Sequence, residues 1–376
     1  MKPKLAFVNK QLEKISKANL YRELRAVRIN GPYLIINNKK LINLSSNDYL
    51  GIPSSTKILG QIQSSSRLVS GNDSSFQIFE KKLARHKSQE GSLIFPTGYM
   101  ANLGAITTIV GKDDLILSDE FNHASIIEAC KLIGSKIAIY KHNDMDDLSS
   151  KLKKSNKRKF VVSEGIFSMD GDFADLNKIT EIAEKNNAIM VLDDAHGDFT
   201  VGKDGKGTPE HFGVSKKIDL YISSLSKGLG SFGGYVASQK NIIELLINKS
   251  KSFIYTSALP SFLVEHSLEK FNYNREKQRK KLWKNVQRIS LGLKQIGYDI
   301  NSTSHIIPII IGKEKNTLEF GKFLFKNGVF AQPIRYPTVP QNKARIRISV
   351  TAWLSKNHID DSLQVLESAA KKFKIV

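Results

Sequence analysis

Polar residues follow four apolar, strand-like runs of this sequence, each at the point where the run ends. They form the segments Thr97–Tyr99, Glu164–Ser168, Asp193–Gly197 and Ser223–Gly228. In open parallel sheets, ligands bind beyond the carboxyl ends of the strands. We therefore expect an acid, an amine, several hydroxyls and an anion-binding helix start to meet at one edge of a sheet.

The acid and the amine point to one kind of chemistry. Lys227 lies among Ser and Gly, where a lysine can be partly desolvated and act as a Schiff-base amine. Asp193 directly follows an apolar run and lies 34 residues before Lys227. A carboxylate in that place can keep a pyridinium nitrogen protonated. This pairing indicates pyridoxal 5'-phosphate. Its phosphate would bind the helix start at Thr97, Gly98 and Tyr99, with help from the Ser224 hydroxyl.

Each feature also occurs without such chemistry. A Ser-x-x-Lys stretch is common in surface loops, Asp-Asp-Ala-His can form a capping turn, and Thr-Gly-Tyr can simply begin a helix. The order of the acid and the lysine, each at a strand end, favours catalysis. The alternative of another class is a non-catalytic protein that binds the cofactor or nucleic acid.

The positive net charge of the chain is the feature that suggests nucleic-acid binding. The 57 Lys and Arg outnumber the 36 Asp and Glu, for a formal net charge of +21. The basic residues are mostly lysines scattered along the chain, and no known nucleic-acid motif accompanies them. We expect no nucleic-acid partner, although a positive surface would suit phosphate-bearing or acidic substrates.

Composition excludes several other classes. With 40% hydrophobic and 25% charged residues, the 376-residue chain is not a disordered scaffold. No run approaches the roughly 18 apolar residues of a membrane helix, and the first residues lack a signal-peptide pattern. Cys130 is the only cysteine, which excludes an intrachain disulfide and a multi-thiolate metal site. We expect a cytoplasmic protein with no metal and no membrane partner.

The elements that must position these residues have an α/β pattern. Lys159–Gly165, Ala188–Asp193 and Ile218–Ser224 are strand-like, and Leu176–Asn187 between them has helical periodicity. This alternation predicts a mainly parallel sheet covered by helices.

The two ends of the chain have a different pattern of expected elements. A hairpin is expected around Asn37-Asn38, and a long charged helical stretch runs from about residue 261 to Leu293. Strands at 306–311 and 345–350 and helices at about 316–327 and 358–373 follow. We expect an N-terminal helical arm and hairpin (1–45), a large α/β domain (46–260) and a small C-terminal α+β domain (261–376).

Four motifs together resemble the α-oxoamine synthases, and the resemblance covers nearly the whole chain. They are Asn43–Gly51, Glu164–Asp172, Asp193–Gly197 and Ser224–Gly234. That family consists of fold-type I, aspartate aminotransferase-like enzymes that use pyridoxal phosphate. Its members join an amino acid to an acyl thioester, from coenzyme A or an acyl carrier protein, with loss of carbon dioxide.

The resemblance implies roles for individual residues. Lys227 would hold the cofactor covalently and act as the general base, and Asp193 would pair with the pyridine nitrogen. His196 would hydrogen-bond the phenolic oxygen of the ring, with Ser168 beside the same oxygen. His123 would stack on the ring.

The same resemblance implies a homodimer with shared active sites. Ser224 would bind the cofactor phosphate of its own subunit. The segment Thr256–Pro260 resembles one whose hydroxyl reaches the phosphate of the partner subunit, which makes Ser257 the candidate.

A bidentate cation is needed for the carboxylate of the amino-acid substrate. Arg345 and Arg347 share a strand face by the period of two, and the family pattern selects Arg347. Asn47 and Arg335 are further candidates. Tyr336 stands where the family has a proline, which departs from the pattern around Arg335.

Two stretches favour one specificity within the family. Gly202–Gly213 and His142–Asp144 most resemble members that condense L-alanine with a pimeloyl thioester. Sibling specificities, glycine with acetyl-CoA or serine with a long acyl donor, stay open. Ser64–Ser66 and Phe76 depart from the relatives' glycines and histidine, which leaves the acyl-donor preference open.

Overall fold

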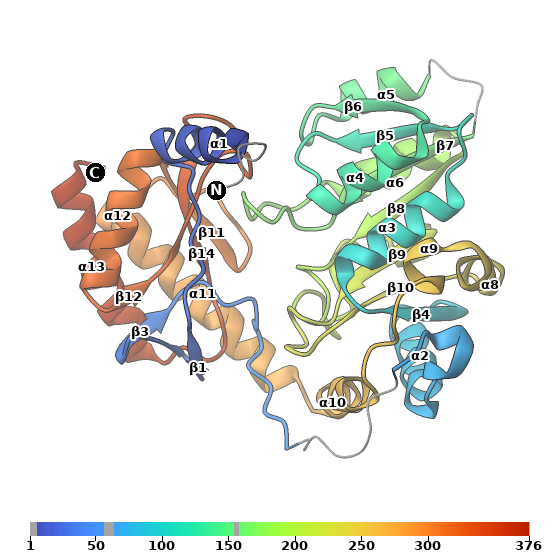
Figure 1. Ribbon diagram of the computed structural model, residues 1–376, viewed down its shortest axis with the longest axis horizontal. Coiled ribbons are helices and arrows are strands. Elements are labelled where there is room, and N and C mark those ends of the chain that lie inside the picture. Colours follow the sequence, from blue (N-terminus) through green and yellow to red (C-terminus); the bar gives the residue numbers. More distant parts are fainter. Residues whose placement is uncertain (1–5, 56–63, 154–157, 376) are drawn as a thin grey trace. The chain divides into compact units, whose positions relative to one another are not determined.

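A computed structural model describes residues 6–55, 64–153 and 158–375 (Figure 1). The chain divides into two compact units. Unit 1 contains the described parts of Met1–Ser46, Met169–Gly171 and Lys281–Val376, and unit 2 contains those of Asn47–Ser168 and Asp172–Lys280. The domain boundaries inferred from the sequence stay a prediction.

Unit 2 is built on a seven-stranded sheet with the order β4-β10-β9-β8-β7-β5-β6. Five neighbouring strands, from β9 to β6, pair in parallel, and β10 is antiparallel to both of its neighbours. The predicted strands β4, β7, β8 and β9 are confirmed. The strands are β4 (Gly91–Phe95), β5 (Leu115–Asp119), β6 (Lys136–Tyr140), β7 (Lys159–Glu164), β8 (Ala188–Asp193), β9 (Leu220–Ser224) and β10 (Gly234–Ser238).

Helices flank this sheet and share its core. Helix α3 places Ala101, Ala105 and Ile106 in one apolar cluster with side chains of several strands, and Cys130 is buried there too. The helices of this unit are α2 (Ser74–Lys87), α3 (Gly98–Ile109), α4 (Ala124–Ile133), α5 (Met145–Leu152), α6 (Leu176–Lys185), α7 (Thr208–His211), α8 (Lys240–Lys249), α9 (Lys251–Ile254) and α10 (Ser261–Asn272), with a π-helical turn at Arg67–Gly71 and a 3-10 turn at Ser215–Lys217.

The described part of unit 1 combines two small sheets with four helices. One sheet has the order β1-β2-β3-β12 and the other β11-β14-β13. The predicted hairpin is confirmed, since Asn37 and Asn38 both have positive φ, as a type I′ turn requires. The elements are α1 (Ala6–Lys17), β1 (Arg28–Asn30), β2 (Tyr33–Ile36), β3 (Lys39–Asn43), α11 (Glu276–Ile296, which begins in unit 2), β11 (Ile306–Gly312), α12 (Glu314–Lys326), β12 (Val329–Phe330), β13 (Gln332–Ile334), β14 (Ala344–Ser349) and α13 (Lys356–Phe373).

The prediction of one helical stretch from about residue 261 to Leu293 is wrong in one respect. The structure has two helices there, α10 and α11, which are separated at residues 273–275. Tyr273 is extended, and the Asn274 side chain accepts a hydrogen bond from the Glu276 N–H at 3.1 Å. An Asn that binds a following backbone N–H starts a new helix, and apolar periodicity does not reveal that break.

Candidate functional site

The predicted polar residues lie where parallel strands of unit 2 end. Glu164 of β7 and Asp193 of β8 are register partners, and Asp193 pairs in turn with Ile222 of β9. The carboxyl ends of three adjacent strands therefore bring the acid, the Lys227 turn and the Ser168 segment to one edge of the sheet.

Lys227 and His196, which are distant in sequence, are in direct contact. Lys227 Nζ lies 2.8 Å from His196 Nε2. The Tyr49 hydroxyl donates to Asn47 Oδ1 at 3.1 Å and lies 2.7 Å from His196 Nδ1. The two ring nitrogens of His196 therefore face different partners, Nδ1 the Tyr49 hydroxyl and Nε2 the Lys227 amine. These two contacts fix the orientation of the imidazole ring beside the lysine.

Asp193 is buried, and its carboxylate is oriented on both oxygens. Oδ1 accepts from the Ala195 N–H at 2.9 Å, and Oδ2 accepts from Asn102 Nδ2 at 2.6 Å. The same Asn102 amide donates to Ser125 Oγ at 3.0 Å. These contacts fix the plane of the carboxylate before any ligand binds.

His123 completes this line of hydrogen bonds. Its Nδ1 lies 2.8 Å from Ser125 Oγ and accepts from the Ser125 N–H at 3.3 Å, so His123 caps α4. Burial lowers the pKa of His123, and the positive charge of Lys227 adds to this effect while Asp193 opposes it. His123 is therefore a neutral ring, connected to Asp193 through Ser125 and Asn102.

Glu164 adds a second acid to this edge. It is 3% exposed, and its Oε1 has no hydrogen-bond partner among the residues that the structure describes. Burial raises the pKa of Glu164 well above its ordinary value, and the nearby Asp193 charge raises it further. Glu164 is thus a neutral acid with an unused polar atom, a feature that suits a polar ligand.

The start of α3 packs closely against the end of β9 and the start of β10. A Cβ on Gly98 would lie 3.0 Å from Ser224 Cβ, and one on Gly234 would lie 2.5 Å from Gly98 Cα. Thr97 Oγ1 caps the helix by accepting from the Met100 N–H at 3.1 Å, and Ser224 Oγ lies 2.8 Å from Ser226 Oγ. A helix N-terminus with hydroxyls beside it suits a phosphate group.

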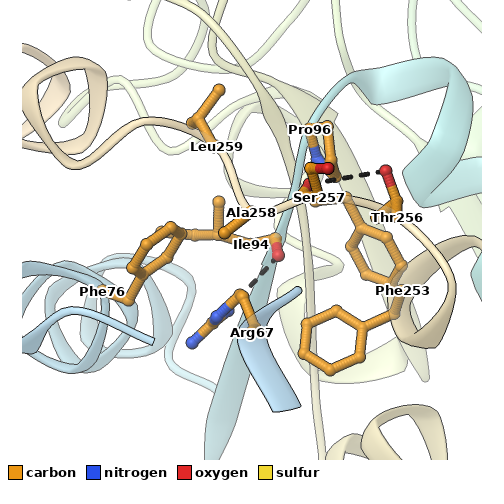
Figure 2. A pocket seen from close by; sticks show the side chains of 10 residues that line it. Arg67, Phe76, Ile94, Pro96, Phe253, Thr256, Ser257, Ala258 and Leu259 are labelled. Atoms are coloured by element: carbon orange, nitrogen blue, oxygen red, sulfur yellow. Dashed lines mark hydrogen bonds between the residues drawn. The ribbon is translucent and has the colours of Figure 1, made fainter. Parts of the chain in front are cut away.

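Tyr99, Ser168 and Ser257, also predicted to bind the cofactor, differ from one another in exposure and in their neighbours. Tyr99 is half exposed, and its ring meets that of His123 edge to face at 6.4 Å between centroids. Ser168 is buried just after β7. Ser257 lines a small apolar pocket with Arg67, Phe76 and other side chains, and Lys227 is not among the residues that line it (Figure 2).

Phe76, which departs from the relatives' histidine, has a structural explanation. Its ring is fully buried, and the Arg67 guanidinium lies 4.2 Å from the ring centroid. Arg67 also binds both carboxylate oxygens of Glu80, at 2.5 and 3.1 Å. Phe76 therefore serves as an apolar platform for a partly buried ion pair. The turn that contains Ser64–Ser66 is tied to the Ser257 segment, because Ala258 N–H donates to Ser65 O at 2.8 Å.

The predicted arginines belong to unit 1. Arg345 forms an ion pair with Asp170 at 2.5 Å, whereas Arg347 donates to Ser349 Oγ at 2.7 Å. The Asp170 carboxylate already pairs with Arg345. The role of Arg347 in binding a substrate carboxylate stays a prediction. Arg335 donates to the carbonyls of Asn19 and Tyr21, so the structure gives it a role in holding the N-terminal segment.

His142 ties together two of the loops around this edge. Its Nδ1 lies 2.9 Å from Asp119 Oδ1, and its Nε2 lies 2.8 Å from Asp172 Oδ2. Burial acts to lower the pKa of His142, but the hydrogen bonds to both carboxylates outweigh it and raise the pKa to about 10. The ring is therefore a bound imidazolium.

The stability contributed by His142 should depend on pH. Because its pKa in the folded state is raised above the ordinary value of 6.5, the contribution is complete below about pH 6.5 and is lost as pH rises through about 10. The free energy of unfolding of His142→Gln should fall below that of the wild type by about 2 kcal/mol at pH 6, and the difference should shrink by pH 10.5. Denaturant unfolding at both pH values measures this, and a difference that does not change with pH would contradict it.

Tyr49, Asn102, Ser125 and Glu164 have no individual role that the sequence alone assigns. Tyr49 and Glu164 lie inside motifs that carry the resemblance, which was a usable signal. Asn102 lies inside a helix, and nothing in its sequence surroundings marks it. Among the described residues, no group of three or more His, Cys, Asp or Glu could hold a metal ion, and no helix is long and apolar enough to cross a membrane.

Known proteins match this chain over nearly its full length. The family model of class I and II aminotransferases matches residues 39–366. The 8-amino-7-oxononanoate synthase of Thermoanaerobacter pseudethanolicus is 41% identical, covering 99% of this chain and 98% of that protein. The enzyme of the same name from Thermosipho melanesiensis is 36% identical, covering 98% of each.

Solved structures agree with this result. A serine palmitoyltransferase from Sphingomonas wittichii matches with a TM-score of 0.92 and 27% identity over 100% of this chain and 99% of that one. The 8-amino-7-oxononanoate synthase of Francisella tularensis matches with a TM-score of 0.75 and 26% identity over 89% of this chain and 99% of that one. The predicted fold-type I architecture is confirmed. This chain therefore belongs to the class I and II aminotransferase family and, within it, to the α-oxoamine synthases.

Proposed function

We propose that this protein is a pyridoxal phosphate-dependent C-acyltransferase of biotin biosynthesis. It condenses L-alanine with a pimeloyl thioester, with loss of carbon dioxide, to give 8-amino-7-oxononanoate. The names of the full-length relatives support this specificity. The observation that carries the chemistry is the 2.8 Å contact between Lys227 and His196, at the same sheet edge as the buried carboxylate of Asp193.

The residues present fit the cofactor. Asp193 offers an oriented carboxylate to a pyridinium nitrogen, Lys227 offers an amine, and the helix start at Gly98, beside Ser224, suits a phosphate. The unused Oε1 of Glu164 marks a place where a polar ligand atom is expected. When bound, pyridoxal phosphate supplies a ring that withdraws electrons from the α-carbon of the amino acid.

The protein groups then control charge and protons. Asp193 favours the protonated ring nitrogen, because a nearby carboxylate stabilises that positive charge. Lys227 Nζ removes the α-proton of alanine as a general base and later returns a proton. His196 Nε2 holds the Lys227 amine in place, and Tyr49 fixes the His196 ring. The neutral ring of His123 provides a flat face for stacking and an N–H for the thioester oxygen.

A sibling specificity is the second candidate. Serine palmitoyltransferases match this fold with a TM-score of 0.92, which favours L-serine with a long acyl donor as that alternative. Glycine with acetyl-CoA is another specificity within the family. The amino acid that drives the reaction distinguishes these candidates.

Thiol release tests the proposal directly. The purified, cofactor-loaded protein is given pimeloyl-CoA with L-alanine, glycine or L-serine in separate reactions, and the freed thiol is measured. We expect release with alanine. Release only with another amino acid or acyl donor would replace the proposed specificity by a sibling one. A protein that releases no thiol with any pair would not be an enzyme of this class.

We also propose a cytoplasmic homodimer in which Ser257 reaches the cofactor phosphate of the partner subunit. Large apolar side chains near the Ser257 segment are exposed, Val69 by 80% and Tyr255 by 82%. Exposed apolar clusters are typical of surfaces that a protein partner covers. Sedimentation equilibrium tests the assembly: we expect the mass of two chains, and the mass of one chain would contradict it.

A further inference from the structure

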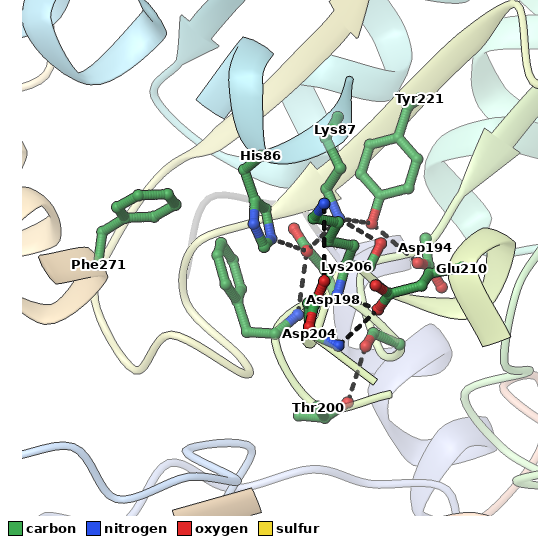
Figure 3. A network of polar contacts seen from close by, with 12 residues as sticks. His86, Lys87, Asp194, Asp198, Thr200, Asp204, Lys206, Glu210, Tyr221 and Phe271 are labelled. Carbon is green, nitrogen blue, oxygen red and sulfur yellow. Dashed lines mark hydrogen bonds and ion pairs between the residues drawn. The ribbon is translucent and has the colours of Figure 1, made fainter. Parts of the chain in front are cut away.

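A buried lysine with no place in the mechanism above, Lys87, interacts with both Asp194 and Asp198 (Figure 3). These two residues bound the turn that follows Asp193 and contains His196. Lys87 is the last residue of α2, and its side chain is 3% exposed. Its Nζ donates to the Asp198 carboxylate, to the Tyr221 hydroxyl at 2.7 Å and to the Lys206 carbonyl at 2.8 Å. All three donor positions of the ammonium group are used.

Asp198 is equally enclosed, with a fully buried side chain. Its Oδ2 accepts from the Tyr235 hydroxyl at 2.5 Å, and its Oδ1 accepts from the Phe199 N–H at 3.0 Å. Burial acts to raise the pKa of Asp198, but the charge of Lys87, with the His86 ring nitrogen 3.5 Å away, outweighs it and holds the pKa below its ordinary value. Lys87 and Asp198 therefore form a buried ion pair.

A second line of contacts runs from Lys87 to the start of the turn. The Tyr221 hydroxyl accepts from Lys87 and donates to Asp194 Oδ2 at 2.8 Å. Asp194 also accepts from the N–H of Thr208 at 2.9 Å and from its hydroxyl at 2.7 Å. Lys87 is thus connected to both ends of the turn Asp194–Asp198.

The backbone carries this constraint to the candidate site. Asp198 N–H donates to the Asp194 carbonyl at 2.8 Å, which closes the turn around His196. The Asp198 carbonyl also lies close to Gly228, where a Cβ would be only 2.4 Å from that oxygen. Gly228 directly follows Lys227, so the position of Asp198 affects both partners of the Lys227–His196 contact.

We propose that the Lys87–Asp198 ion pair positions His196 and Lys227 for the cofactor. This inference rests on the proposed cofactor chemistry and assigns Lys87 and Asp198 as positioning residues, not catalytic ones. An apolar pair of similar size would avoid the cost of burying two charges. A buried ion pair with every hydrogen bond satisfied, in contrast, fixes direction as well as distance. The pair therefore sets the orientation of the turn more narrowly than apolar packing could.

The test separates this role from simple stabilisation. Lys87→Met leaves the Asp198 carboxylate buried without its cation and should lower the unfolding temperature by about 5 °C. The double variant Lys87→Met/Asp198→Asn removes both charges and should regain most of that loss. The matched control is Lys217→Met/Glu184→Gln, which removes an exposed ion pair of the same unit that spans 2.7 Å.

Two readouts report on positioning without any substrate. One is the dissociation constant for pyridoxal phosphate, measured by fluorescence titration. The other is the pH midpoint at which the visible absorption of the cofactor-loaded protein changes. In the double variant we expect about tenfold weaker binding and a midpoint shifted by about half a pH unit, because the His196 contact to Lys227 is no longer held in place. The control pair should leave both values at the wild-type level.

A double variant with wild-type cofactor affinity and a wild-type midpoint would overturn the proposal and make the ion pair merely structural. If the double variant does not fold, Lys87→Arg decides by the same two readouts, because it keeps the charge but not the compact geometry of an ammonium group. A wild-type protein that gives no cofactor absorption would instead overturn the proposed function, and the inference with it.

Discussion

Lys227→Ala is expected to remain folded and to lose turnover by about 10⁴-fold or more, because it removes the amine that contacts His196 and that we propose as nucleophile and base. The His196 ring keeps its contact with Tyr49, so the surrounding structure should persist. Thiol release measured alongside circular dichroism tests both parts of this expectation.

The matched control is Lys216→Ala, which removes an exposed lysine from the same unit. It should leave turnover at the wild-type level. Near-normal activity in Lys227→Ala would contradict the role of this amine, and it would also remove the main argument for the proposed chemistry.

Asp193→Asn should lower kcat by about 10²-fold while changing stability little. Asparagine has the same shape and keeps an oxygen for the Ala195 N–H, but it cannot stabilise a positive ring nitrogen. Stability should change little because the loss of the hydrogen bond from Asn102 is offset by the removal of a buried charge. Steady-state kinetics and thermal unfolding measure the two effects.

Asp114→Asn provides the control for this prediction. Asp114 also belongs to unit 2 and forms an ion pair at 2.6 Å with Arg158, whose side chain is exposed. The kcat of the Asp114→Asn variant should equal that of the wild type. If Asp193→Asn kept wild-type kcat, the carboxylate would have no electronic role and Asp193 would be a purely structural residue.

The strand-end residues could be predicted because their placement is local. Asp193 and Lys227 each follow a continuous apolar run, and such runs form buried parallel strands whose ends meet. The hairpin at Asn37-Asn38 was predictable for the same reason, since asparagine tolerates the positive φ that both residues adopt.

Elements set by particular hydrogen bonds were harder to predict. The break between α10 and α11 depends on one bond from Glu276 N–H to the Asn274 side chain, within a stretch of unbroken helical periodicity. Strand β10 follows a glycine-rich turn, where Gly233 has a φ of +109°, and apolar periodicity does not tell whether such a turn reverses the chain.

The sequence by itself determined the α/β class, the cofactor chemistry and the residues at the strand ends, because these follow from local patterns of apolar and polar residues. Only the tertiary structure decided which polar groups support them. Asn102 reaches Asp193 from 91 residues away, and Lys87 reaches Asp198 from 111 residues away. Partners this distant are selected by how whole elements pack, and a buried Asn or Lys looks the same in sequence as an exposed one.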